Sequence, residues 1–415
     1  MTTVPSAFNQ VEQAPPVAVF KLKDDYTADS AEEKINLGVG AYRDANGQPW
    51  VLPVVRSIEA QMINDPALNH EYLPISGLPA FCQAATKLCL GSDSKAITEN
   101  RAGGVQALSG TGALRLAAEF LKRFYNTHVE STVVSYPDPT WANHDAIFRY
   151  AGFTDRRKYR YWDAKNRCLD LAGLKEDLLQ LPEFSIVILH ACAHNPTGVD
   201  PTQEQWKEIA DVCKQKNHFP VFDSAYQGFA TGDPDVDAWS IRHFEKCGFE
   251  FFVCQSFSKN FGLYNERVGN LAMVMKDPDS LTRSRSQLEL IIRGMYSNPP
   301  NHGARVVATA YVIHLHWEWH DNIRTMSARI KQMRKSLHEK LKILGTPGNW
   351  DHIVNQIGMF YTGLNQAQCE FMVKQKHIYL MKSGRISMCG LTEGNIDYFA
   401  QSLHEAVTKI NENKL

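Results

Sequence analysis

The feature that most constrains the fold is a series of short apolar runs in the middle of the chain, each ending in polar residues. Stretches with helical periodicity, such as TQEQWKEIADVCKQK, separate several of these runs. Strands that alternate with helices predict an α/β domain with a largely parallel sheet. The expected strands are STVVS (131–135), FSIVILHA (184–191), FPVF (219–222), FFVCQ (251–255) and GNLAMVM (269–275).

The last third of the chain has a different character. Apolar residues there recur at helical spacing and stop at the sequence GTPGNW, which predicts a long amphipathic helix. A further helix is expected from about Ile396 to Ile410. At 415 residues the chain exceeds the roughly 250 to 300 residues of a single core, so two domains are expected. The residues that define the long helix are Ile330, Met333, Leu337, Leu341 and Leu344.

Polar side chains follow three of the apolar runs. Ligands of an open α/β sheet collect beyond the carboxyl ends of its strands, so these side chains would meet in one crevice if the strands are neighbours. Taken alone, each of these residues could have a purely structural role, because most lysines are solvated and an aspartate after a strand is commonly a turn residue or helix cap. In chain order they are Asn195, then Asp223 and Tyr226, then Ser256, Ser258 and Lys259.

The sequence SGTGALRLAAEFLKRFY at 109–125 predicts a phosphate site. Ser109, Gly110 and Thr111 come immediately before a helical pattern, and free N–H groups at a helix start bind phosphate well. The stretch matches neither the dinucleotide-binding pattern nor a P-loop, so a capped helix without a ligand is the alternative. Arg267 and Ser256 could add a guanidinium and a hydroxyl to the same anion.

A lysine, an aspartate and a phosphate site together indicate pyridoxal phosphate, which binds to a lysine amine as a Schiff base and pairs its pyridine nitrogen with an acid. Phe257 and Phe261 would remove water from Lys259, and Arg267 would place a like charge nearby, both of which favour the neutral amine. Trp141 is suited to lie against a cofactor ring, although a lone tryptophan is more often a core residue.

Seven stretches of the sequence together resemble the aspartate aminotransferases, which are fold type I pyridoxal phosphate enzymes. The resemblance runs from about Phe8 to Ile410 and implies a large domain with a mostly parallel sheet flanked by helices, plus a smaller α/β domain. The implied boundaries are an N-terminal arm at 1–16, a small domain at 17–48 and 326–415, and a large cofactor-binding domain at 49–325. The stretches are NLGVGAYRD, NHEYLPI, PTWANH, HACAHNPTG, VFDSAYQGFA, SFSKNFGLYNERVGN and YSNPPNHGAR.

The resemblance also implies a role for each cofactor-site residue. Lys259 would hold pyridoxal 5'-phosphate as a Schiff base and move the substrate proton. Asp223, supported by His144, would keep the pyridine nitrogen protonated, and Trp141 would stack on the ring. The ring hydroxyl would be bound by two residues, Tyr226 and Asn195. The implied phosphate ligands are Ser109, Gly110, Thr111, Ser256, Ser258, Arg267 and Tyr72 of the partner subunit.

The implied substrate site binds a dicarboxylic amino acid. Arg385, with Gly40 and Asn195, would take the α-carboxylate, and Trp141 is also an implied substrate-binding residue. Arg293 matches the arginine that binds the distal carboxylate from the other subunit; from its own sequence context it would form a surface salt bridge on a helix. The implied reaction is transamination of L-aspartate with 2-oxoglutarate to oxaloacetate and L-glutamate, by a ping-pong mechanism in a homodimer with shared active sites.

Two alternatives stay open. One is an aminotransferase or β-lyase of broader range, acting on aromatic or sulfur amino acids, against which Arg293 argues. The other is a pyridoxal phosphate-binding paralogue without turnover. The segment at 358–364, which has one residue fewer than is usual in the family, keeps the second open. The segment at 308–320 is also one residue shorter than usual.

Composition excludes several other classes. Charged residues make up 21% of the chain and the net charge is -1, with no basic patch for nucleic acid and no apolar run long enough for a membrane span. The nine cysteines form no C-x-x-C pair, which predicts reduced thiols and no metal site. The N-terminal sequence has no targeting pattern, so a cytoplasmic location is expected, and the C-terminal sequence NKL resembles the peroxisomal signal only loosely.

Overall fold

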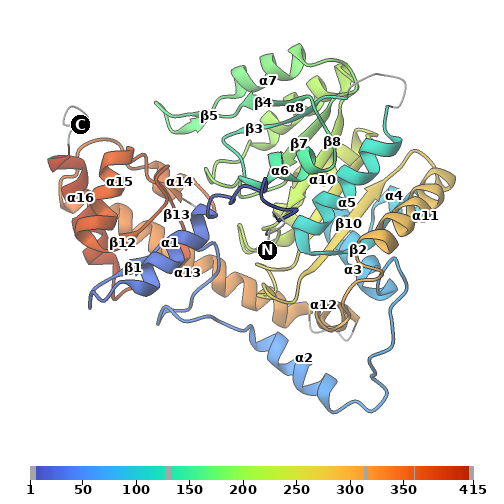
Figure 1. The fold of residues 1–415 in the computed structure, drawn as a ribbon, viewed down its shortest axis with the longest axis horizontal. Coiled ribbons are helices and arrows are strands. Elements are labelled where there is room, and N and C mark those ends of the chain that lie inside the picture. Colours follow the sequence, from blue (N-terminus) through green and yellow to red (C-terminus); the bar gives the residue numbers. More distant parts are fainter. Residues whose placement is uncertain (1–5, 127–131, 313–315, 359, 411–415) are drawn as a thin grey trace, which may run out of the picture.

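The computed structural model describes residues 6–126, 132–312, 316–358 and 360–410. At its centre is a seven-stranded sheet (Figure 1), in which only β10 runs antiparallel to its two neighbours. The other four neighbouring pairs are parallel, which confirms the predicted α/β class. The strand order is β2 (Ala102–Leu108), β10 (Val268–Val274), β9 (Phe251–Ser256), β8 (Phe219–Ser224), β7 (Ile186–His190), β3 (Val134–Asp138) and β4 (Arg156–Arg160).

Helices cover both faces of this sheet, because its central strands are apolar on both sides. In β7, Ile186 and Ile188 contribute to one core, and Val187 and Leu189 to another. On the first face lie α5 (Ser109–Phe124), α6 (Asn143–Tyr150) and α11 (Pro278–Met295). On the second lie α7 (Leu171–Gln180), α8 (Gln203–Gln215) and α10 (Trp239–Lys246).

The remaining elements of this part of the molecule surround the sheet. They are the helices α2 (Pro53–Ile63), α3 (Pro79–Leu90), α4 (Lys95–Thr98), α9 (Pro234–Asp237) and α12 (His302–Val312), and the paired strands β5 (Trp162–Asp163) and β6 (Cys168–Leu169). Capping residues determine where several of the helices begin. At α8, for example, Thr202 and Gln205 form a reciprocal capping box.

A second, smaller body lies to the left in Figure 1 and combines a segment near the N-terminus with the C-terminal part of the chain. It contains α1 (Ala18–Ala28), α14 (His352–Asn355), α15 (Gln366–Lys376), α16 (Ile396–Lys409) and the short helix η1 (Met388–Gly390). Two strand pairs complete it: β1 (Ile35–Asn36) with β12 (Ile378–Tyr379), and β11 (Phe360–Tyr361) with β13 (Arg385–Ile386). Helix α13 (His316–Ile343) contacts α2 and α12 of the large body as well as α14 and α16 of the small one. The arrangement resembles the expected two domains, and the boundaries given above stay a prediction.

The sequence misplaced or missed some elements. The helix predicted around 330–344 begins much earlier, at His316, and ends before Leu344. The strand predicted at 131–135 begins at Val134 and continues to Asp138, and residue 131 lies outside the described residues. The sequence prediction did not find β2 and β4. None of the described helices is long and apolar enough to cross a bilayer.

Candidate active site

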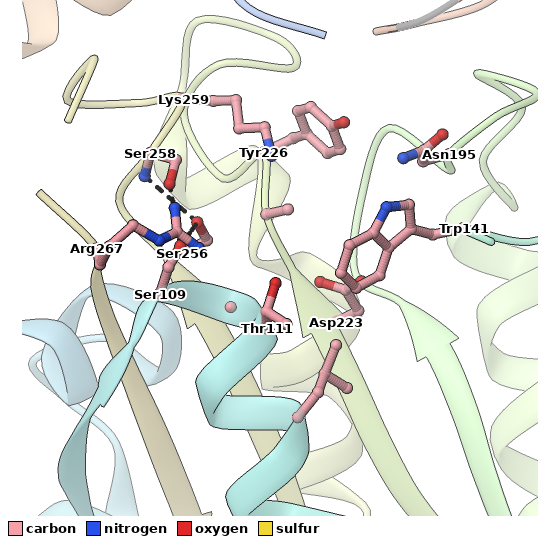
Figure 2. Close-up of a pocket in the computed structure, with 13 residues that line it drawn as sticks. Ser109, Thr111, Trp141, Asn195, Asp223, Tyr226, Ser256, Ser258, Lys259 and Arg267 are labelled. Carbon is pink, nitrogen blue, oxygen red and sulfur yellow. Dashed lines mark hydrogen bonds between the residues drawn. The ribbon is translucent and has the colours of Figure 1, made fainter. Parts of the chain in front are cut away.

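A cavity of about 230 Å³ lies beyond the carboxyl ends of β7, β8 and β9, next to the start of α5. Figure 2 shows the serines and Arg267 on one side of it and Trp141 and Asn195 on the other. Most of the predicted site residues therefore meet, as their positions after neighbouring strands indicated. The lining residues are Ser109, Gly110, Thr111, Leu114, Trp141, Asn195, Asp223, Ala225, Tyr226, Ser256, Ser258, Lys259 and Arg267.

One end of the cavity has the chemistry of an anion cradle. The hydroxyl of Ser109 lies 3.0 Å from those of both Ser256 and Ser258, and all three serines are buried. The first turn of α5 begins here, so its N–H groups are not engaged by the helix itself. Arg267 lines the same end, and burial lowers the pKa of its guanidinium. Hydroxyls, helix N–H groups and a guanidinium are the donors that bind a phosphate.

Glycines keep this cradle open. A Cβ on Gly110 would lie 3.1 Å from the Cβ of Ser256. A Cβ on Gly269, in β10, would lie 2.4 Å from the carbonyl carbon of Ser109, closer than atoms approach without a shift. Ser109 itself has a φ of 63°, a left-handed conformation that places the chain turn directly at the cradle. The start of α5 and the adjacent strand are thus packed backbone to backbone.

Asp223 supplies the single carboxylate among the residues that line the cavity. It is buried at the end of β8, and its Oδ2 lies 3.0 Å from Nε2 of His144, which is fully buried. Burial alone would raise the pKa of Asp223, but the hydrogen bond to His144 and the nearby positive charges outweigh burial and hold the pKa below its usual value. The carboxylate is therefore charged at neutral pH and can pair with a cationic ring nitrogen.

Lys259 follows β9 and lines the cavity, with its Nζ 5.1 Å from the centre of the Tyr226 ring. Removal from water lowers the pKa of Lys259; the carboxylate of Asp223 opposes this change and the charge of Arg267 adds to it. Phe257 and Phe261 are buried beside it, as the sequence predicted. The result is an amine that loses its proton more readily than an exposed lysine, which a nucleophile and a proton carrier both require.

The aromatic residues of the cavity are held in place by their neighbours. The Trp141 ring packs edge-on against His144, with centroids 5.4 Å apart. Burial raises the pKa of Tyr226, so its phenol stays protonated and can donate a hydrogen bond into the cavity.

The other predicted residues lie outside this cavity. Arg385, in β13, is partly buried and its Nη2 donates to the carbonyl of Gly38 at 2.7 Å, near Gly40. Tyr72 is 82% exposed, and Arg293 is exposed on α11. Arg293 donates to Ser297 Oγ, and the described residues show no salt bridge for it. Within a single chain, Tyr72 and Arg293 therefore do not reach the site.

The sequence prediction missed a layer of residues behind Asp223. Thr140 Oγ1 lies 2.8 Å from Nδ1 of His144 and 3.2 Å from Nε2 of His190. The His190 ring packs in turn against that of His194, with centroids 4.3 Å apart. The available signal was the pair of histidines in HACAHNPTG, a stretch that begins with the last residue of β7. Among the described residues, no group of three or more His, Cys, Asp or Glu side chains is arranged to hold a metal.

Comparison with known proteins identifies the family of this chain. The family model for aminotransferase class I and II matches residues 32–403. The chain is 59% identical to a protein of Gallus gallus named aspartate aminotransferase, cytoplasmic, over 98% of this chain and 99% of the relative. A cytoplasmic aspartate aminotransferase of Saccharomyces cerevisiae has a similar structure, with a TM-score of 0.93 and 46% identity, covering 97% of this chain and 98% of that one.

A third relative shows the cofactor. It is an aromatic-amino-acid aminotransferase from Burkholderia pseudomallei, covalently bound to pyridoxal phosphate, with 38% identity, a TM-score of 0.93 and coverage of 97% of this chain and all of that one. Fold and site thus define a pyridoxal phosphate-dependent transaminase. The chain belongs to the class I and II aminotransferase family.

Proposed function

We propose that the protein transfers the amino group of L-aspartate to 2-oxoglutarate, giving oxaloacetate and L-glutamate, in the cytoplasm. The main structural support for this proposal is that Lys259, Asp223 and a serine-rich anion cradle line one cavity. The names of the relatives from Gallus gallus and Saccharomyces cerevisiae support both the substrate and the location.

The cavity fits pyridoxal phosphate. The cradle of Ser109, Ser256 and Ser258, with Arg267 and the N–H groups that follow Ser109 in the first turn of α5, would hold the phosphate. At the other end the charged carboxylate of Asp223 would pair with the ring nitrogen. When bound, the cofactor supplies a ring that withdraws electrons and so stabilises negative charge at the substrate Cα.

The residues of the chain bind, orient and move the proton. Lys259, with its lowered pKa, would attach the cofactor covalently and, once released, take a proton from the substrate Cα. His144 keeps Asp223 ionised through its 3.0 Å contact. Trp141 would cover one face of the ring and exclude water, while Tyr226 and Asn195 would bind the ring hydroxyl.

Substrate selection would depend on two arginines. Arg385 would bind the α-carboxylate together with Asn195 and Gly40. Arg293 would bind the distal carboxylate, and because it is exposed on its own chain it would act in the site of a partner subunit, as would Tyr72. We therefore propose a homodimer with shared active sites, in which a substrate without a distal carboxylate leaves a buried arginine unpaired.

Borohydride reduction of the protein loaded with pyridoxal phosphate, followed by peptide mapping, tests whether the cofactor binds to Lys259. The label is expected on Lys259, and a label elsewhere would overturn the proposal. A coupled assay with aspartate and 2-oxoglutarate should show turnover. A label on Lys259 without product would support the paralogue that lacks turnover. Faster reaction with aromatic or sulfur amino acids would support the enzyme of broader range.

A further inference from the structure

A buried arginine outside the cavity binds the backbone of the segment 353–358. This segment lies close to the loop that carries Asn195 and leads into the strand that pairs with the strand of Arg385. Arg334 belongs to α13 and is 3% exposed. Its Nη1 donates to the carbonyl of Ile353 at 2.8 Å and its Nη2 to the carbonyl of Gly358 at 2.6 Å. Burial lowers the pKa of Arg334 to about 10. A buried guanidinium is costly unless its hydrogen bonds are satisfied, so these contacts fix the geometry of the segment 353–358.

The segment 353–358 lies against the loop that carries Asn195. The N–H of Ile357 donates to the carbonyl of Gly198 at 2.7 Å. Gly358, with a φ of 73°, approaches Ala193 so closely that a Cβ on it would lie 2.9 Å from the Cβ of Ala193. Ala193 and Gly198 flank Asn195, which lines the cavity.

The same loop has a second support. The partly buried carboxylate of Asp200 accepts hydrogen bonds from the N–H groups of Ala193 and His194, at 2.6 and 2.8 Å. The position of Asn195 therefore depends on two supports. One is Asp200, and the other is the segment held by Arg334.

The chain just beyond this segment reaches the second part of the site. Strand β11 pairs with β13, and Tyr361 is the register partner of Arg385. Asn195 and Arg385 are the two side chains assigned above to the substrate α-carboxylate. They come from distant parts of the sequence. The segment 353–358 contacts the backbone next to Asn195, and strand β11 pairs with the strand that carries Arg385.

We propose that Arg334 is a positioning residue for the substrate α-carboxylate, which it serves by holding the segment 353–358 against the Asn195 loop and so setting where strand β11 meets β13. The proposal rests on the proposed function, because it assigns that carboxylate to Asn195 and Arg385. It assigns Arg334 no contact with the substrate or the cofactor. Loss of Arg334 should therefore weaken carboxylate binding more than it changes cofactor content.

The test compares holoenzymes carrying Arg334→Met, Arg334→Lys or Arg329→Met with the wild type. Arg329 is a matched control on the same helix, because it also donates to backbone carbonyls, those of Asp44, Cys389 and Leu391, but not to 353–358. The readouts are the Kd of succinate, an unreactive dicarboxylate, the KM and kcat for aspartate, the cofactor absorbance and the melting temperature.

For Arg334→Met we expect the Kd of succinate and the KM for aspartate to rise roughly tenfold, with cofactor content unchanged. Arg334→Lys keeps a donor and should lie between this variant and the wild type. Arg329→Met should lower the melting temperature with at most about a twofold change in the succinate Kd. Equal succinate affinity in the Arg334→Met and Arg329→Met proteins would overturn the inference. So would losses of succinate affinity that are proportional to the fall in melting temperature across the variants.

If Arg334→Met does not fold, a second variant can still test the inference. Gly358→Ala leaves the arginine in place but pushes a methyl group against Ala193, and its left-handed φ disfavours alanine. It should also weaken succinate binding, and wild-type affinity in both Gly358→Ala and Arg334→Lys would contradict the inference. A wild-type protein that neither binds succinate nor turns over aspartate would instead contradict the proposed function.

Discussion

Asp223 is the residue whose charge matters most to the proposed chemistry. It is buried, it faces His144 and it lines the cavity that contains Lys259. Asp223→Asn preserves the shape of the side chain but removes the charge that would stabilise a protonated ring nitrogen. We expect kcat for aspartate to fall by about 10² to 10³, the usual loss for one preorganised electrostatic group.

Steady-state kinetics checks this expectation, and cofactor absorbance shows whether the variant still holds pyridoxal phosphate. Asp321→Asn, on the exposed part of α13, is the control and should leave kcat unchanged. A wild-type kcat in a fully loaded Asp223→Asn protein would mean that the carboxylate does not act on the ring.

The sequence predicted the residues that end strands, and the family resemblance added His144, but the other residues that support them were missed. Asp223 and Lys259 directly follow apolar runs, so their neighbourhood was deducible from strand order. Thr140 and His190 are fifty residues apart in the sequence and meet only because β3 and β7 pair. Arg334 was hidden for a similar reason, because its partners are backbone carbonyls near 353–358 and carry no side-chain signal.

Asp237 gives the stability of the fold a predictable pH dependence. It is buried, its Oδ2 accepts from the N–H of Gly228 at 2.8 Å and its Oδ1 accepts from Thr231 Oγ1 at 2.7 Å. Burial nevertheless raises the pKa of Asp237 to about 7. Since this lies above the pKa of an unfolded aspartate, the stabilisation from this group is complete below about pH 4 and is lost as pH rises through about 7.

Asp237→Asn imitates the protonated acid and cannot titrate. The melting temperature of the variant minus that of the wild type should therefore be larger at about pH 8 than at about pH 5, whatever the size of this difference at low pH. Differential scanning calorimetry at both pH values measures this, with Asp321→Asn as an exposed control. A difference between variant and wild type that stays constant with pH would show that Asp237 does not titrate in this range.

At the scale of elements, the site depends on how closely β10 packs against the start of α5. A Cβ at Gly269 would lie 2.4 to 2.6 Å from backbone atoms of Ser109, which cannot move aside as a flexible side chain can. Gly269→Ala should therefore displace the cradle. We expect the affinity for pyridoxal phosphate to fall at least roughly tenfold, and the melting temperature to fall as well.

Equilibrium binding of pyridoxal phosphate to the apoprotein measures this effect. Gly394→Ala is a suitable control, because its Cβ would make only an ordinary contact at 3.8 Å and its φ is not left-handed. Unchanged cofactor affinity in Gly269→Ala would show that the cradle can shift without loss.

The elements that the sequence missed share a physical cause. Strand β2 contains two consecutive glycines, Gly103 and Gly104, and β4 has the sequence RRKYR. Neither has a strand-like apolar pattern, and both lie at an edge of the sheet, where pairing with one neighbour is enough. The long helix α13 was found only in its second half because its first turns, HWEWH, lack regular apolar spacing.

At the scale of the whole molecule, the sequence predicted a mostly parallel sheet and a second body at the C-terminus, because alternating strands and helices and a long amphipathic helix are strong patterns. It could not fix the domain boundaries, since α13 packs against both bodies. The division at 17–48, 49–325 and 326–415 therefore stays a prediction.

A shared active site is the property of the assembly that a single chain cannot show. Lys259 lines the cavity of its own chain, whereas Arg293 is exposed on α11. If Arg293 acts in the partner's cavity, Lys259→Ala and Arg293→Asp should each be inactive towards aspartate alone. In a mixed dimer, however, one of the two cavities receives an intact Lys259 and an intact Arg293.

Unfolding and refolding the two inactive proteins together in equal amounts should therefore restore roughly a quarter of wild-type activity, because about half the dimers are mixed and each has one intact site. Two controls, each variant refolded alone, should remain inactive. If Arg293 served its own chain, every cavity in the mixture would lack one of the two residues and no activity would return. Recovery of aspartate turnover on mixing thus separates a homodimer with shared sites from a pair of independent subunits.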